Sequence, residues 1–182
     1  PDERLQKLTE MITPKKTVPT TFEFTDIAGL VKGASRGEGL GNKFLANIRE
    51  TDAICEVVRC FRDKDITHVD GSVDPVRDVE TINLELVMAD LETVDKRIGK
   101  IEKKAQTGDK EAKAEMDVLE PLKEVLEAGK MARTLTFNKE EMVYVKQFNL
   151  LTTKPMIYVA NMGEEDIEDP NSNPYYITLK EY

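Results

Sequence analysis

The sequence contains few of the residues that form disulfides and metal sites. It has two cysteines, Cys55 and Cys60, and one histidine, His68, in 182 residues. The cysteines are five positions apart within one expected strand, so they fall on opposite faces and are not placed to bridge each other. A zinc site would require a second pair of Cys or His ligands. We therefore expect reduced thiols, as in cytoplasmic proteins, and a solvated histidine in a polar loop.

Long apolar runs and an excess of positive charge are also missing. No apolar run approaches the ~18 residues that a membrane helix needs, and no signal-peptide pattern opens the chain. We therefore expect a cytoplasmic protein without a membrane partner. The net charge of -9 argues against a surface generally coated by nucleic acid, but it leaves a local basic patch open. The 40% hydrophobic and 34% charged fractions are typical of a soluble globular protein with much exposed helix.

The first part of the chain alternates between strand and helix patterns. Apolar residues at helical spacing predict a helix that ends before Pro14, and Phe22 and Phe24 alternate with polar residues as in a strand. After a glycine-rich loop come a short amphipathic helix and a second strand, apolar on both faces as in a buried strand. This order predicts an α/β fold with a βαβ unit, a mostly parallel sheet and flanking helices. The expected strands cover 20–29 and 53–61, and the helix between them covers 41–52.

A helical hairpin is expected next. Apolar residues step by three and four over three heptads, and a polar break then leads to Asp109 as the N-cap of a second helix. Pro121 falls inside that helix and should kink it. Two such helices joined by a short turn make an antiparallel hairpin that projects from the sheet. The heptad positions are Leu84, Val87, Leu91, Val94, Ile98, Ile101 and Ala105, and those of the second helix are Ala112, Met116, Leu119, Leu122 and Leu126.

The last part of the chain returns to the sheet. A short helix over 138–149, a third strand ending in a polar turn, and the start of a final helix at 174–182 complete the pattern. We therefore divide the chain into a first nucleotide-binding segment, the hairpin insertion and a return segment. Their boundaries are 1–74, 75–134 and 135–182.

Two short motifs follow expected strands. Asp26 is followed three residues later by Gly29, a spacing that suits a carboxylate on hydrated Mg²⁺ and a backbone N–H on a terminal phosphate. A mobile surface loop explains this DxxG pattern equally well, because four-residue patterns are frequent by chance. Asn161 and Glu164 follow the third strand, where an α/β fold presents base-reading residues. The alternative is that Asn161 only caps the turn at the strand end.

A much longer stretch carries a resemblance. The run DIAGLVKGASRGEGLGNKFLANIRETDAICEVVRCF, with VANMGEED further on, closely resembles the Obg-like ATPases of the YchF type, a branch of the translation-factor-related P-loop GTPases. The likeness extends through the hairpin and covers essentially the whole chain. It implies a partial P-loop NTPase fold with an inserted helical hairpin, and an ATP-hydrolysing nucleotide switch associated with ribosomes.

The resemblance also implies roles for individual residues. Asp26 would serve Mg²⁺ and Gly29 the γ-phosphate. Leu30 stands where Ras-like GTPases carry the glutamine that orients water, so catalysis must be arranged differently. Asn161 and Glu164 match the base-recognition motif Asn-Lys-x-Asp, with Met162 in place of lysine. Without the aspartate, guanine's donors lose a partner, so the motif favours ATP; GTP binding with relaxed base preference is the alternative.

One family feature is missing, and one surface feature stands out. The sequence contains no Walker A loop, G-x-x-x-x-G-K-[ST], so we expect an internal piece that does not hydrolyse ATP at a useful rate and whose sheet exposes an apolar edge. A non-catalytic interaction module is therefore a further alternative.

Seven basic against three acidic residues between Lys96 and Lys113 surround the hairpin tip, a charge that suits ribosomal RNA or a ribosomal protein. The alternative is that these lysines only solvate a coiled coil.

Overall fold

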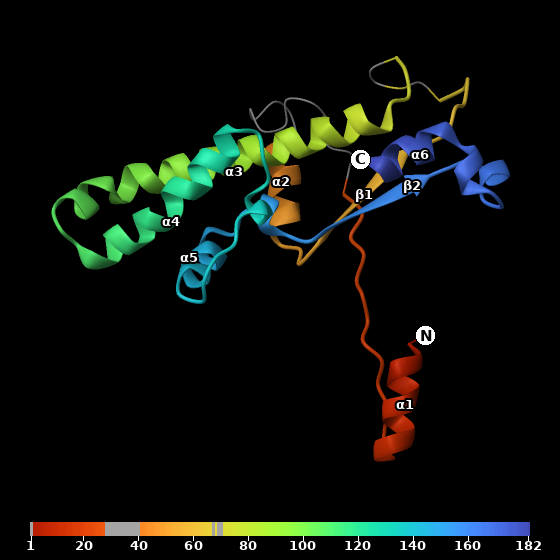
Figure 1. Ribbon diagram of the computed structural model, residues 1–182, viewed down its shortest axis with the longest axis horizontal. Coiled ribbons are helices and arrows are strands. Elements are labelled where there is room, and N and C mark those ends of the chain that lie inside the picture. The colour runs from red at the N-terminus through yellow and green to blue at the C-terminus, as the bar shows by residue number, and fades with distance from the viewer. Residues whose placement is uncertain (1, 28–40, 67, 69–70) are drawn as a thin grey trace.

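The computed structural model describes residues 2–27, 41–66, 68 and 71–182, and it is an α/β structure with a long projecting helix pair (Figure 1). The helices are α1 (Glu3–Ile12), α2 (Gly41–Arg49), α3 (Pro75–Gln106), α4 (Lys110–Glu127), α5 (Glu141–Phe148) and α6 (Pro174–Glu181), and the strands are β1 (Ile54–Arg59) and β2 (Met156–Asn161). Short 3₁₀ turns are η2 (Ala132–Thr134), η3 (Leu151–Thr153), η4 (Glu164–Asp166) and η5 (Pro170–Ser172). In the described residues, no helix is long and apolar enough to cross a membrane.

The two strands form a parallel pair, as expected for a parallel sheet, but they are the second and third of the expected strands. The βαβ unit expected over 20–61 is not formed in its described residues. Their register runs from Ile54 opposite Met156 to Arg59 opposite Asn161, and α3, α4 and α5 make the crossover between them. A parallel pair requires such a long connection, because the second strand must start at the same end as the first. The carboxyl ends of both strands therefore lie at one edge of the sheet.

One face of this sheet is covered and the other is open. Val79 of α3, with Tyr175 and Leu179 of α6, packs on the face that carries Val58 and Tyr158. On the opposite face Val57 is 64% exposed and Ile157 62% exposed. The expectation that β1 is buried on both faces is therefore wrong for the described chain, since the helices that pack on the sheet cover one side only. The two thiols do lie on opposite faces, with Cys55 exposed and Cys60 buried.

The long helix α3 belongs to both parts of the molecule. Its first half covers the sheet, and its second half runs on to pair with antiparallel α4 (Figure 1). Asp109 caps α4 as predicted, accepting from the Ala112 N–H at 2.9 Å. Helix α4 continues on both sides of Pro121, and the expected kink stays a prediction.

The heptad prediction fails at its first position. Leu84 is 53% exposed, whereas Val87, Val94 and Ile101 are buried. The reason is the length of α4, which has 18 residues against 32 in α3. Because α4 ends at Glu127, it packs on the second half of α3 and leaves Leu84 without a facing helix.

The expected strand over 20–29 is not formed in its described part. Residues 20–27 are extended but lack strand pairing, and Phe22 and Phe24 are each 83% exposed. Alternation alone does not make a strand, because the backbone also needs a ladder partner. This segment joins α1, which lies apart from the body and buries none of its residues, to the sheet region (Figure 1). Ile27, at the end of the described segment, packs against the main core cluster.

Candidate functional site

The base-recognition residues expected from the sequence lie at the carboxyl end of β2. Asn161 is the last residue of the strand, and its carbonyl accepts the Cys60 N–H at 2.7 Å. The side chains of Asn161 and Glu164 are exposed, whereas Met162 is half-buried and packs against Val58 and Cys60. The parallel strand thus ends with two polar side chains open to a ligand and one apolar side chain anchored in the core.

A residue that the sequence analysis did not identify supports this turn. Asn173 is only 4% exposed and caps α6, where its Oδ1 accepts the N–H groups of Tyr175 at 2.8 Å and Tyr176 at 3.1 Å. Its Nδ2 donates to the Cys60 carbonyl at 2.8 Å and to Asp166 Oδ2 at 2.6 Å. The signal present in the sequence is Asn before Pro174, a combination typical of the start of a helix.

Arginines order the loop that follows β1 at the same edge. Arg59 donates from Nε to the carbonyl of Phe61 and from Nη1 to the carbonyl of Ile66, both at 3.1 Å. Arg62 hydrogen-bonds the hydroxyl of Tyr175 and lies over its ring, 5.4 Å from the centroid. The edge is therefore held by α6 from one side and by its own loop from the other.

The switch motif is only partly within the described residues. Asp26 is exposed and has no hydrogen bond or ion pair with a described residue, while Gly29 and Leu30 lie outside the described residues. In the part of the chain that the structure describes, no hydrogen bond or ion pair joins Asp26 to Asn161, Met162 or Glu164.

The donor set for a magnesium ion is correspondingly small. Among the described residues no group of three His, Cys, Asp or Glu side chains could hold a metal. Mg²⁺ is ordinarily bound by one or two carboxylates together with substrate phosphates and waters. Asp26, as a single exposed carboxylate, fits that pattern as one protein ligand.

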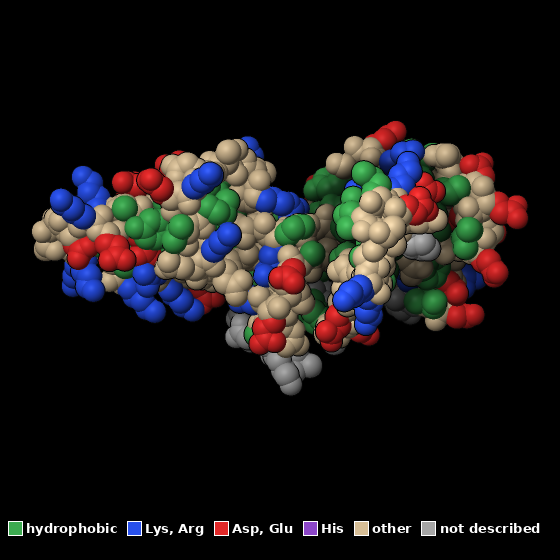
Figure 2. Space-filling view, turned by 90° about the horizontal axis from the view of Figure 1, so that it is seen from below, with side chains coloured by type: hydrophobic (Ala, Val, Ile, Leu, Met, Phe, Trp, Pro, Cys, Tyr) green, Lys and Arg blue, Asp and Glu red, His purple; other side chains and the backbone are tan. Residues whose placement is uncertain are grey.

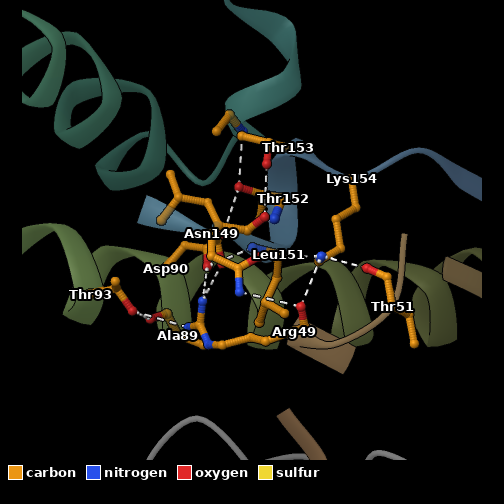
Figure 3. Close-up of polar contacts among 12 residues, drawn as sticks. Arg49, Thr51, Ala89, Asp90, Thr93, Asn149, Leu151, Thr152, Thr153 and Lys154 are labelled. Carbon is orange, nitrogen blue, oxygen red and sulfur yellow. Dashed lines mark hydrogen bonds and ion pairs between the residues drawn. The ribbon is translucent and has the colours of Figure 1, made fainter. Parts of the chain in front are cut away.

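A buried polar cluster fixes α2 and the segment before β2 to the middle of α3 (Figure 3). Asp90 is fully buried and accepts the N–H groups of Leu151 at 2.9 Å and Thr152 at 2.7 Å, and the Thr152 hydroxyl at 2.7 Å. Arg49, the last residue of α2, lies 3.5 Å from Asp90 and donates to the Asn149 carbonyl at 2.8 Å. Burial raises the pKa of Asp90, and the three hydrogen bonds and Arg49 oppose that shift.

The C-terminal end of α2 is closed by a lysine. Lys154 Nζ donates to the carbonyls of Thr51 at 2.6 Å and Arg49 at 3.1 Å, which satisfies backbone groups at the C-terminus of the helix (Figure 3). Because α2 directly follows residues 28–40, which include most of the glycine-rich loop, this cluster connects that part of the sequence to the hairpin and to β2.

Glu56 of β1 is a half-buried acidic residue on the face of the sheet that carries Val58. Glu56 Oε2 is enclosed and has no hydrogen-bond partner among the described residues, and burial followed by the charge of Asp78 raises the pKa of Glu56 to about 8. Burial and Asp78 also raise the pKa of the Cys60 thiol. His68 is half-buried, with Nε2 2.9 Å from Asp78 Oδ2, so the expectation of a solvated histidine is wrong. The ring of His68 therefore lies against a carboxylate in the first turns of α3.

The hairpin presents a basic surface. Of the seven basic residues, Arg97 forms a two-bond ion pair with buried Glu115, and Lys96 pairs with Glu92. The other five are exposed and form no ion pair with described residues: Lys100, Lys103, Lys104, Lys110 and Lys113. We call these five the tip lysines. A hollow of about 340 Å³ between α3, α4 and α5, lined in part by Lys96, Lys100 and Phe148, adjoins them.

Known proteins resemble this arrangement along its whole length. Residues 4–162 match the family described as 50S ribosome-binding GTPase. The chain is 59% identical over 182 residues to the ribosome-binding ATPase YchF of Bacillus subtilis and 51% identical over 181 residues to that of Escherichia coli O157:H7. In both cases the match includes 100% of this chain but only 50% and 49% of the relative, so the chain spans about half the length of these curated relatives.

A solved structure agrees with the sequence comparison. The YchF GTPase of Schizosaccharomyces pombe superposes with a TM-score of 0.80 at 40% identity, over 100% of this chain and 49% of that one. The parallel strand pair and the inserted helix pair are thus shared with a YchF protein. Because the family match covers most of the sequence, the chain belongs to the 50S ribosome-binding GTPase family.

Proposed function

We propose that the protein is an ATP-binding and ATP-hydrolysing nucleotide switch that acts at the ribosome in the cytoplasm. The observation that carries the proposal is that Asn161 and Glu164 are exposed in the turn after β2. The chain belongs to a family of GTPases, whose base-recognition motif is Asn-Lys-x-Asp. Glu164 replaces the aspartate that would accept from guanine, and Met162 replaces the lysine. The YchF relatives carry the name ribosome-binding ATPase, which supports the same assignment.

In this function each switch residue has a defined task. Asp26 supplies a carboxylate ligand to Mg²⁺, whose charge would neutralise the phosphates. Gly29 offers its backbone N–H to the γ-phosphate. Leu30 has no polar atom to orient water, so hydrolysis depends on a group other than the residue that Ras-like GTPases use.

Competition between nucleotides tests this proposal. We expect ATP to displace a bound fluorescent ATP analogue at least about fivefold better than GTP, because an unpaired guanine donor costs about 1–3 kcal/mol. The assay uses these 182 residues in place of the matching segment of the Bacillus subtilis relative, so that a complete YchF chain is present. Equal displacement by ATP and GTP would instead support the second candidate, a GTP-binding protein with relaxed base preference, which the name YchF GTPase of the Schizosaccharomyces pombe protein favours.

We further propose that the hairpin contacts the ribosome through the tip lysines. Five exposed lysines without a described ion pair, beside a hollow with further basic lining, suit the phosphates of ribosomal RNA. If the 182 residues bind ribosomes without turning over ATP, the hairpin acts as an interaction module in its own right.

A further inference from the structure

Asn173 connects three segments that meet at the carboxyl edge of the sheet. Its Nδ2 donates one hydrogen bond to Asp166, at the end of η4, and one to the backbone carbonyl of Cys60, just after β1. Its Oδ1 accepts two N–H groups at the start of α6. With two donated and two accepted bonds, the amide uses its full donor capacity and both acceptor lone pairs.

Both donated bonds lead to the base-recognition turn. The first holds Asp166, whose backbone N–H donates to the Gly163 carbonyl at 3.1 Å. This hydrogen bond closes the turn in which Glu164 lies. The second holds Cys60, whose own N–H donates to the Asn161 carbonyl at 2.7 Å. Asn173 is thus linked to Asn161 indirectly, because Cys60 hydrogen-bonds to both residues. It is linked directly to the turn that carries Glu164, through its hydrogen bond to Asp166.

We propose that Asn173 is a positioning residue for nucleotide base recognition, which fixes Asn161 and Glu164 relative to each other. The inference rests on the proposed nucleotide-binding function and deepens it. Asn161 and Glu164 are exposed, so few packing contacts fix the geometry of their turn. A buried amide with four hydrogen bonds supplies that geometry instead, because its own position is fixed by the sheet and by α6.

The chemistry of Asn173 allows its two roles to be separated. Asn173→Asp keeps an oxygen for capping α6, and Asp is as good an N-cap as Asn. The same substitution removes the NH2 group that donates both hydrogen bonds and puts an oxygen in its place. That oxygen faces the Asp166 carboxylate and the Cys60 carbonyl and is repelled by both, because little water reaches this buried site. The variant should therefore retain α6 while releasing the turn.

The measurement compares a ligand with a base and one without. In the same chimaera with the Bacillus subtilis relative, we expect Asn173→Asp to weaken ATP binding about tenfold and to lower the preference for ATP over GTP. Binding of inorganic tripolyphosphate, which has no base, should change less than about twofold. Asn171→Asp is the matched control, since it adds the same charge to an exposed residue two positions away that has no side-chain hydrogen bond to a described residue.

A second substitution tests the contact itself. Asp166→Asn should restore at least half of the lost ATP affinity in the Asn173→Asp background, because the amide introduced in η4 can then donate to the new carboxylate at the α6 cap. If Asn173→Asp does not fold, Asp166→Ala removes the same contact from a less buried side, with a smaller loss of ATP affinity expected. Equal losses for ATP and tripolyphosphate, or no rescue, would overturn the positioning role.

Failure of this inference is distinguishable from failure of the proposed function. If Asn161→Ala and Glu164→Ala weaken ATP binding but Asn173→Asp does not, only the positioning role is wrong. If neither Asn161→Ala nor Glu164→Ala changes ATP affinity, the base-recognition role itself is wrong.

Discussion

The raised pKa of Glu56 reflects the burial of its side chain on the covered face of the sheet. Glu56 lies opposite Tyr158 in the strand pair, on the face that α3 covers, and its pKa is raised to about 8. An unfolded glutamate has a pKa of about 4.3. Between these two values the folded chain holds a proton that the unfolded chain has released, so the free energy of unfolding falls as the pH rises through that window.

Glu56→Gln should remove this pH dependence. We expect the variant to exceed the parent in free energy of unfolding by about 1–3 kcal/mol at pH 9, with the difference shrinking toward pH 5, because glutamine has no charge to bury. Urea denaturation at pH 5, 7 and 9 measures this. Glu120→Gln, an exposed change on α4, is the control and should leave the pH profile unaltered. Parallel profiles for parent and Glu56→Gln would contradict the assignment.

The elements are held together by Asp90 rather than by surface ion pairs. Its buried carboxylate satisfies two backbone N–H groups in η3 and lies beside the half-buried Arg49 of α2. The pair between Asp95 and Lys123 on the hairpin, at 2.7 Å, is shorter, but both side chains are partly exposed to solvent. Buried pairs are costly to break and exposed pairs contribute little, so the two aspartates make a matched comparison.

We expect Asp90→Asn to lower the free energy of unfolding by about 3 kcal/mol and Asp95→Asn by less than about 1 kcal/mol. Asparagine keeps one oxygen acceptor but turns an NH2 group toward the other buried backbone N–H, and it removes the charge beside Arg49. The second change leaves a lysine that water can reach. Urea denaturation followed by circular dichroism provides both values. Similar losses for the two variants would show that the buried cluster does not stabilise the fold.

The elements that could be predicted from the sequence are those with local signals. The helices follow from periodicity, and the cap at Asp109 follows from neighbouring residues. The prediction of a strand over 20–29 was wrong for its described part because pairing depends on distant residues, which alternation does not report. Asn173 and Asp90 were missed for the same reason: their partners lie 113 and 61 residues away in the chain. Asp90 does leave one trace, as an acid inside the apolar stretch LVMADL.

At the scale of the whole molecule, charge is unevenly distributed. The chain carries a net charge of -9, yet Lys and Arg gather over the hairpin end, whereas Asp and Glu line the rim of the sheet end (Figure 2). Such a separation orients the molecule toward a polyanion, because the acidic end is repelled while the basic end is attracted. The hairpin is therefore the part expected to meet RNA first.

Charge reversal tests this orientation. We expect Lys100→Glu, Lys103→Glu and Lys104→Glu together to reduce co-sedimentation of the chain with ribosomes at least tenfold at moderate salt, and to flatten its salt dependence. The control reverses Lys130, Lys139 and Lys146, which are also exposed and give the same net charge. If both triple variants lose binding equally, net charge and not the hairpin surface governs the interaction.

Asp90 lies near the middle of α3, so the second half of the helix extends as an arm beyond the buried cluster. The helix has 32 residues, and from Asp90 to its end at Gln106 the arm measures roughly 24 Å at ~1.5 Å per residue. A change of about 10° in the direction of this arm at Asp90 would move its end at Gln106 by about 4 Å, on the order of the rise of one helical turn. Arg49, at the end of α2, lies 3.5 Å from Asp90, so α2 meets α3 at the inner end of this arm and the tip lysines lie around its outer end.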